Sequence, residues 1–183
     1  MHRQEPAPAK AGGKAHKPYE FGTKVSITTT NRRCKGGMFV LHTKALPGNP
    51  YDGHTLAQAI EETETLTGCP IERAYVDKGY RGHSTPNPLR VFISGQKRGV
   101  HGVIKRELRR RSAIEPIIGH MKDDGHLGRN FLWGRHGDQN NAVLSAIGHN
   151  LRLVLKWLRH LWCLIMAVAI SALDRHSALN AAI

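Results

Sequence analysis

FGTKVSITTT (residues 21–30) and MFVLHTKAL (residues 38–46) are two segments rich in β-branched residues, and the turn-forming segment NRRCKGG separates them. Each segment alternates approximately between apolar and polar residues, which is typical of strands with one buried face. Because the connection is short, we predict that the two strands pair antiparallel.

A helix and two further short strands are predicted downstream of these strands. The segment PGNP (residues 47–50) breaks the chain, and a helical pattern then runs from about His54 to Leu66. Its expected inward residues are Leu56, Ile60 and Leu66, and its expected solvated residues are Glu61, Glu62 and Glu64. Residues 71–77 and 91–93 are short apolar strands, and the pattern is helical, with one interruption, from about residue 103 onward. This order predicts a mixed α/β layer structure.

The chain is strongly basic, with 27 Lys and Arg residues against 14 Asp and Glu residues and a formal net charge of +13. Such a charge favours a polyanionic partner, and nucleic acid in particular. Residues 18–183 are long enough for one domain with its own core, whereas residues 1–17 mix charge, proline and glycine without an apolar run. We expect residues 1–17 to be a disordered or extended leader.

Cysteine spacing and hydropathy bear on the cellular compartment. The three cysteines are far apart and form no paired spacing, which argues against a disulfide framework and for a reducing cytosol. The apolar stretch from Leu161 to Leu173 is shorter than the about 20 residues of a membrane-spanning helix. We therefore predict C-terminal helices at about residues 140–173, amphipathic at first and then buried against the domain, with no membrane partner.

Asp77 is the first candidate for chemistry, because it ends a predicted strand and is followed by a glycine-containing loop. Ligands of open α/β sheets gather at the carboxyl ends of strands, where such a carboxylate lies. The competing interpretation is a loop aspartate that only caps or turns the chain.

Glu115 is the second candidate, within the segment KRELRRRSAIEPIIGHMK (residues 105–122). In a continuous helix, Arg111, Glu115 and Lys122 share one face, which suits a site that holds a metal ion beside phosphates. The alternative is a capping box, in which Ser112 begins a helix and Glu115 bonds back to its amide. Pro116, which is tolerated near a helix start, is compatible with that alternative.

A dense basic run precedes Glu115 and is opposed only by Glu107. Neighbouring like charges destabilise a helix unless a counter-ion is present, so the run favours phosphate binding over a merely solvated face. Its members are Lys97, Arg98, Lys105, Arg106, Arg109, Arg110 and Arg111.

Six motifs in order resemble the insertion-sequence-five-type family of DDE transposases. They are PYEFGTKVSI, LPGNPYDGHTL, YVDKGYRGH, GQKRG, IKRELRRRSAIEPIIGHMK and GRNFLWGRHGDQNNAVLSAIGHNLR, and together they cover nearly everything from Pro18 to about Trp162. The resemblance implies an RNase H-like core, two Mg²⁺ (or Mn²⁺) ions, and cleavage and joining of double-stranded DNA at transposon ends. It also implies a bacterial, cytoplasmic and nucleoid-associated protein.

The resemblance assigns roles to individual residues. Asp77 corresponds to the second catalytic and metal-binding aspartate, and Glu115 corresponds to the glutamate, with Arg111 and Lys122 beside it. Tyr80 and Arg81 match the loop that contacts DNA near the metals. The family usually has a tyrosine three residues before this arginine, where the chain has Leu108.

The main departure from the family concerns the first catalytic aspartate. In the family it lies on a strand well upstream of the motif that contains Phe21, and no acid before Glu20 lies in an apolar strand here. We therefore expect an N-terminally truncated RNase H-like core that binds DNA, is inactive alone, and associates with itself or with full-length transposase. The alternative functions are a non-catalytic DNA-binding regulator of full-length transposase and a basic RNA-associated protein.

Overall fold

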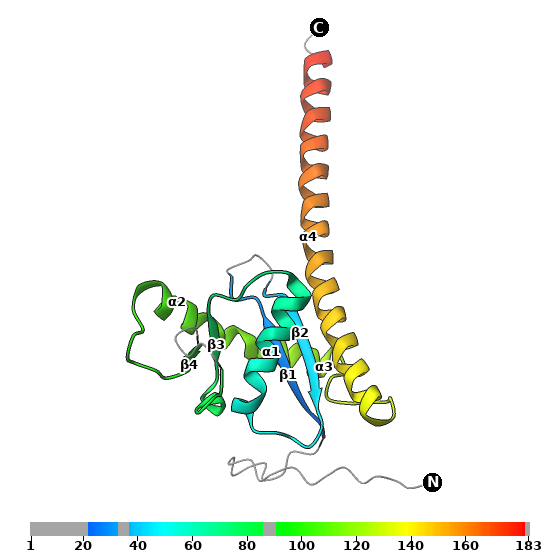
Figure 1. Cartoon of the computed structure of the whole chain (residues 1–183). Coiled ribbons are helices and arrows are strands. Elements are labelled where there is room, and N and C mark those ends of the chain that lie inside the picture. The colour runs from blue at the N-terminus through cyan, green and yellow to red at the C-terminus, as the bar shows by residue number, and fades with distance from the viewer. Residues whose placement is uncertain (1–21, 33–36, 86–90, 182–183) are drawn as a thin grey trace.

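The computed structural model describes residues 22–32, 37–85 and 91–181, with only the backbone given for residues 176–181. The predicted leader therefore lies outside the described residues. The described elements confirm the mixed α/β class and are arranged as in Figure 1. In chain order they are β1 (Lys24–Thr29), β2 (Val40–Leu46), α1 (Asp52–Thr67), β3 (Ala74–Val76), the 3₁₀ turn η1 (Lys78–Tyr80), β4 (Val91–Ile93), α2 (Gly102–Arg110), the 3₁₀ turn η3 (Arg111–Ala113), α3 (Ile114–Asp123) and α4 (Gly134–Ala181).

The four described strands form two separate pairs. β1 and β2 are antiparallel, as predicted, with Lys24 opposite Leu46 and an irregularity between Thr28 and Thr29. β3 and β4 are parallel, and Val76 lies opposite Ile93. Within the described ranges, β1 and β3 therefore each have a strand partner on one side only.

Helix α1 packs its inward face on the pair formed by β3 and β4. Leu56 is buried with Val76 and Val91, and Ile60 packs against this cluster. The prediction that Leu66 faces inward is wrong, because Leu66 is 68% exposed. Thr63, seven residues after Leu56 and so two helical turns further on, takes the inward position and is fully buried.

Two amide side chains of α4 close the outer edge of β2. Asn150 accepts from the backbone N–H of Val40 (2.9 Å) and donates to its carbonyl (2.8 Å). Gln139 accepts from the N–H of Ala45 (2.7 Å) and donates to the carbonyl of Thr43 (3.2 Å). Since an exposed edge strand presents unpaired backbone groups, these contacts fix α4 along β2 in place of a third strand.

The apolar core beneath this contact joins β2, α3 and α4. Its buried members are Met38, Val40, Ile117, Met121 and Ala146, and Met121 is fully buried. These residues come from three segments of the chain, so the core positions α3 against the sheet.

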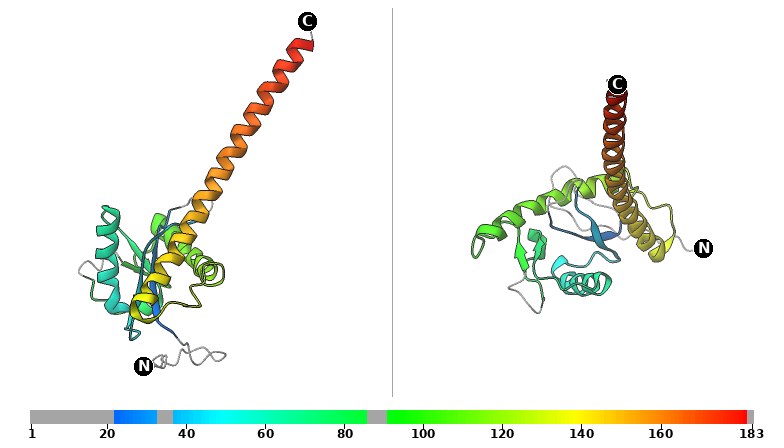
Figure 2. Two further views of the ribbon diagram at one scale, coloured as in Figure 1. Left: turned by 90° about the vertical axis from the view of Figure 1, so that its right-hand side faces the viewer. Right: turned by 90° about the horizontal axis from the view of Figure 1, so that it is seen from above.

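Beyond the core, α4 projects away from the domain as a single rod (Figures 1 and 2). Leu153 is the last buried residue on it, and residues 154–175 are all exposed. The prediction that the stretch after Leu161 is buried against the domain is therefore wrong, because the helix continues straight past the last element it contacts. By length and composition α4 could also cross a membrane, which on its own is weak support for that location.

Candidate active site and basic surface

Asp77 follows β3 directly and caps the turn η1. Its Oδ1 accepts from the backbone N–H of Lys78 at 2.6 Å, so the capping role expected of a loop aspartate is present. The side chain nevertheless remains 63% exposed at the carboxyl end of the strand. Capping therefore orients the carboxylate without burying it.

Glu115 lies in the first turn of α3, and the capping box that was the alternative role for it does not form. Ser112 donates to the carbonyl of Arg109 (2.7 Å), and Ala113 precedes α3 without a side-chain cap. Because η3 separates α2 from α3, the helix is not continuous from Arg111 to Lys122. Glu115 is 72% exposed and therefore available to a ligand.

Arg111 joins the two candidate carboxylates. Its Nη2 lies 3.8 Å from Asp77 Oδ1 and 3.8 Å from Glu115 Oε1, although these residues are 38 positions apart in the chain. The two oxygens are consequently separated by no more than twice 3.8 Å, or 7.6 Å. The Arg111 side chain is the least exposed of the three, at 16%.

The loop that carries Asp77 rests on the N-terminus of α1. Asp52, which is ion-paired with Lys24, lies beneath Gly79, and a Cβ added at Gly79 would be 2.5 Å from Asp52 Oδ2. Tyr80 is directed inward from the same loop. Burial, followed by the charge of Asp52, raises the pKa of Tyr80, while a hydrogen bond with Ser26 opposes that shift. Sequence reasoning missed Asp52, whose only local signal was its place at a helix start.

A groove of about 2640 Å³ runs between the two strand pairs and is lined by Asp77 but not by Glu115. All of β1 and β3 line it, together with Asp77, Arg111 and Lys122. The lining also includes the apolar side chains of Phe131 and Trp133, which are 78% and 89% exposed.

The free edge of β1 is directed away from β2. Gln139 contacts the backbone groups of Thr43 and Ala45 at the outer edge of β2, so these residues form the non-hydrogen-bonded pairs of the ladder. Their partners Ile27 and Val25 therefore direct their own backbone groups away from β2. The groove is thus lined by strand backbone that has no strand partner in the described residues.

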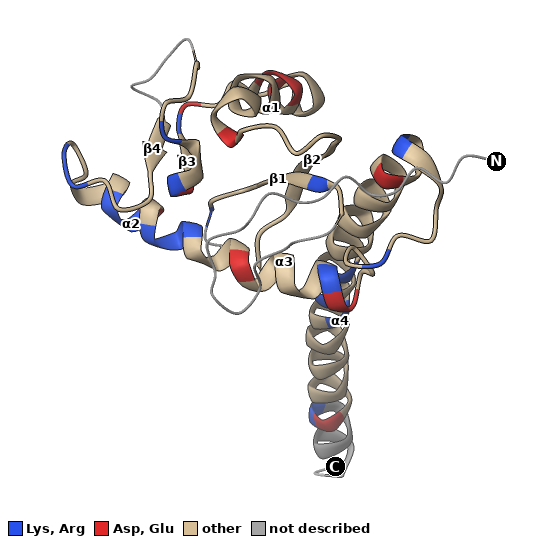
Figure 3. Cartoon of the chain, turned by 90° about the horizontal axis from the view of Figure 1, so that it is seen from below, with Lys and Arg blue, Asp and Glu red and all other residues tan. Residues whose placement is uncertain are grey.

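The basic run divides into an exposed set and a half-buried set. Arg110 donates to the carbonyl of Asn31 (2.9 Å), and Arg111 faces the carboxylate pair, so both half-buried side chains already have partners within the protein. Figure 3 shows Lys and Arg along α2 and the loop before it. The exposed members are Lys97, Arg98, Lys105, Arg106 and Arg109.

Glu107 does not neutralise this surface, because it faces the domain. Its carboxylate binds Arg73 at 3.0 Å and accepts from the hydroxyl of Tyr75, which attaches α2 to β3. Burial and the hydrogen bond to Glu107 raise the pKa of Tyr75, so its hydroxyl remains a donor.

The other residues expected to contact DNA lie in different surroundings. Arg81 is exposed after η1, and its backbone carbonyl accepts from the Tyr51 hydroxyl. Lys122 is exposed in the last turn of α3 and lines the groove. Tyr80, in contrast, packs against the core cluster of α1 and β3.

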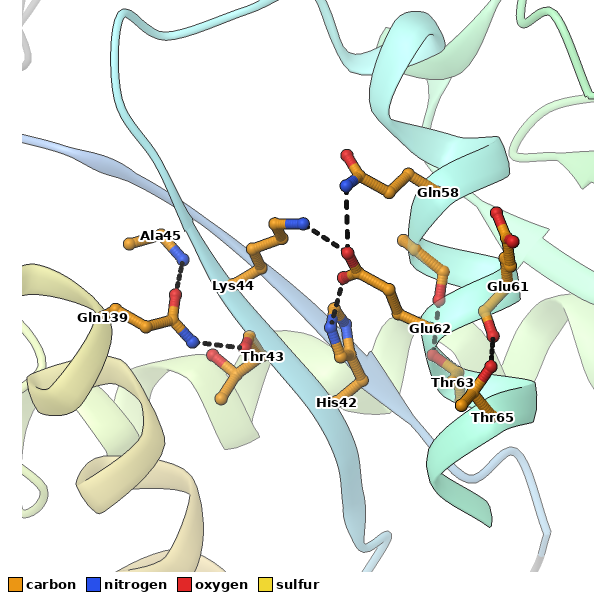
Figure 4. Close-up of polar contacts among 11 residues, drawn as sticks. His42, Thr43, Lys44, Ala45, Gln58, Glu61, Glu62, Thr63, Thr65 and Gln139 are labelled. Carbon is orange, nitrogen blue, oxygen red and sulfur yellow. Dashed lines mark hydrogen bonds and ion pairs between the residues drawn. The ribbon is translucent and has the colours of Figure 1, made fainter. Parts of the chain in front are cut away.

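A second group of titratable residues joins α1 to β2 (Figure 4). Glu62 binds Lys44, and its Oε2 lies 2.9 Å from His42 Nε2. The prediction that Glu62 lies on the exposed side of the helix is therefore wrong, because α1 turns this residue toward the sheet. Burial acts to raise the pKa of Glu62, but the hydrogen bonds and charges of Lys44 and His42 outweigh it and lower the pKa. This cluster fastens α1 to β2.

Within the described residues, no group of three His, Cys, Asp or Glu side chains has the geometry to hold a metal ion. The site therefore consists of two carboxylates, one shared arginine, and an adjoining groove and basic surface.

Comparison with known proteins gives no match: no family model fits the sequence, and no curated protein and no solved structure resembles it.

Proposed function

We propose that the chain is a transposase-family protein that binds double-stranded DNA through the α2 surface and presents Asp77 and Glu115 to a phosphodiester. The observation that carries this proposal is the convergence of Asp77 and Glu115 on Arg111. The same two residues are the ones that the motifs assign to catalysis. Such a protein acts on DNA in the bacterial cytoplasm.

The basic surface supports the DNA-binding part of the proposal. Its five exposed cations lie on α2 and the loop before it, and Arg109 is two residues from the arginine that joins the carboxylates. DNA held along this surface would bring a phosphate to the carboxylates. Each neutralised phosphate releases counter-ions, so we expect binding to weaken steeply with salt.

The donor set fits one hard cation. Asp77 and Glu115 offer carboxylate oxygens, which Mg²⁺ and Mn²⁺ prefer, and both side chains are exposed enough to rotate. A shared Mg²⁺ needs each oxygen about 2.0–2.1 Å from the ion, so the pair must close and Arg111 must give way. When bound, such an ion activates water and stabilises the leaving oxygen of the phosphodiester.

A two-ion site needs a further carboxylate, and we propose that an additional strand in the groove supplies it. The free edges of β1 and β3 both line the groove, so an extended segment could pair with either edge. Its carboxyl side chain would then reach the end of β3, beside Asp77. This arrangement would complete the RNase H-like core that the family resemblance implies.

A nicking assay tests the proposal. The 183-residue chain is mixed with a transposon-end duplex and Mg²⁺ or Mn²⁺, with and without an extended peptide of alternating apolar residues that carries one aspartate. We expect DNA binding throughout, background cleavage by the chain alone, and cleavage with the peptide. A peptide with asparagine in place of that aspartate is the matched control, and Asp77→Ala and Glu115→Ala remove the activity.

Two results would contradict the proposal. If duplex DNA does not bind at low salt, or binds no better than single-stranded RNA, the assignment to DNA is wrong. If the chain alone cleaves strongly and either substitution abolishes cleavage, a third carboxylate already completes the site.

A non-catalytic DNA-binding regulator is the second candidate function. The observation that favours it is Arg111 itself, whose positive charge already lies beside both carboxylates and competes with a cation. This candidate predicts that DNA binds but that no peptide restores cleavage. Inhibition of full-length transposase by the chain would then identify the regulator.

A further inference from the structure

The projecting part of α4 carries an uninterrupted apolar seam. Its members recur at alternating intervals of four and three residues, the spacing by which one helix packs along another. They are Ile147, Leu151, Val154, Leu158, Leu161, Ile165, Val168 and Ala172. The seam spans 26 residues, and a repeat sustained over about three to four heptads is long enough to associate.

The seam is exposed along its whole length. The exposed fractions of its seven larger side chains range from 39% at Val154 to 66% at Val168, and Ala172 is exposed as well. The face of α4 that packs on the domain is a different one, formed by Ala142, Ser145, Ala146, His149 and Leu153. A partner could therefore lie along the seam without displacing the domain (Figure 2).

Three cations on this part of α4 lie opposite the seam, and Arg175 comes one seam position after its last member, Ala172. Arg152, Lys156 and Arg159 follow one another at intervals of four and three residues, so they form a stripe of their own. At about 100° per residue, that stripe is roughly half a turn from the seam. Two copies of the seam could thus pack together while all these cations remain in solvent.

A bilayer and the leader are poorer occupants of the seam. Between Arg159 and Asp174 the uncharged run is 14 residues, or about 21 Å of helix at 1.5 Å per residue, against a hydrocarbon core about 30 Å thick. Residues 1–17 contain no leucine, isoleucine, valine or aromatic residue. They therefore offer no apolar face of their own.

We propose that the α4 seam binds the α4 seam of a second copy of this chain. A seam that is apolar throughout and free of charge complements itself, as the symmetric contact of a homo-oligomer requires. Association through the seam would hold two carboxylate sites in one particle. The proposal stands on α4 alone and does not depend on the DNA-binding function.

Sedimentation velocity of the full chain without DNA tests the proposal with a matched pair of variants. Leu158→Lys with Ile165→Lys places two lysines in the seam. Cys163→Lys with Ile170→Lys places two on the opposite face, where both native residues are also exposed. Circular dichroism establishes that both variants keep the helix content of the wild type.

We expect the wild type and the opposite-face variant to sediment as two or more copies of the 20.3 kDa chain, and the seam variant as a monomer. Four buried side chains are lost per dimer, and each is worth about tenfold in affinity, so the dissociation constant rises about 10,000-fold. A monomeric wild type, or equal dissociation of both variants, would overturn the proposal. So would flotation of the wild type with phosphatidylcholine–phosphatidylglycerol vesicles that both variants lose, because this result would indicate a membrane helix.

Discussion

Neutralising the exposed face of α2 is expected to change the salt dependence of DNA binding by a calculable amount. The perturbation is Lys105→Gln, Arg106→Gln and Arg109→Gln in one chain. These three side chains are exposed, whereas Arg110 and Arg111 are half-buried, contact Asn31 and the carboxylate pair, and stay unchanged. The variant therefore removes charge without removing a structural hydrogen bond.

The magnitude follows from the number of exposed cations. If all five bind phosphates, this surface contributes about −4.5 to the slope of log K against log salt, and the two left in the variant contribute about −1.8. A fourfold rise in salt, from 50 to 200 mM, would then weaken binding through this surface about 500-fold in the wild type and about 12-fold in the variant.

Fluorescence anisotropy of a labelled duplex at several salt concentrations measures these slopes. Lys156→Gln with Arg159→Gln is the control, because it removes exposed cations from α4, away from the candidate site. We expect the control to keep the wild-type slope of log K against log salt and the α2 variant to have a shallower slope. Equal slopes for the α2 variant and the wild type would refute the assignment of this face to DNA.

The remaining predictions concern stability. The pKa of Glu62 is lowered from 4.5, so its contacts stabilise the fold above that pH and are lost as pH falls through the folded pKa. Glu62→Gln should therefore make the urea midpoint depend less on acid pH. Asn150→Ala should cost about 2–4 kcal/mol by urea unfolding, since it leaves both backbone groups of Val40 unpaired, whereas the exposed Asn140→Ala should cost nothing. Gly79→Ala should destabilise the loop, because the new methyl group would lie 2.5 Å from Asp52 Oδ2. Asp52→Ala, which also removes the ion pair with Lys24, should cost less in the Gly79→Ala background than in the wild type; an additive pair would contradict this contact.

Local patterns were sufficient to predict most elements of the fold. The β-branched segments gave β1 and β2, and the short apolar runs gave β3 and β4, because strand periodicity and turn residues act over a few positions. Inward positions were harder to predict. Thr63 replaces Leu66 in the core because the helix phase, and not hydrophobicity, decides which residue faces the sheet.

The candidate site was predictable only in part. Asp77 and Glu115 were singled out as candidates from their local positions and motifs, yet local spacing left open whether Ser112 would cap Glu115. Asp52 and the groove depend on contacts between distant segments, which no local pattern encodes. The projection of α4 was missed for a similar reason, since an apolar helix has the same sequence whether the domain or a second chain covers it.

Cation binding by the carboxylate pair is the most direct test of the account. Electron paramagnetic resonance of free Mn²⁺ measures affinity for the chain and for Asp77→Ala, Glu115→Ala and their combination, with the exposed Asp123→Ala as control. We predict one Mn²⁺ site that either single substitution removes. The affinity of the double variant should be no lower than that of the single variants. Arg111→Gln should bind Mn²⁺ on the order of tenfold more tightly, because the competing charge is gone. Affinity unchanged by Asp77→Ala or Glu115→Ala, or lowered equally by Asp123→Ala, would contradict the claim that these two carboxylates form one site.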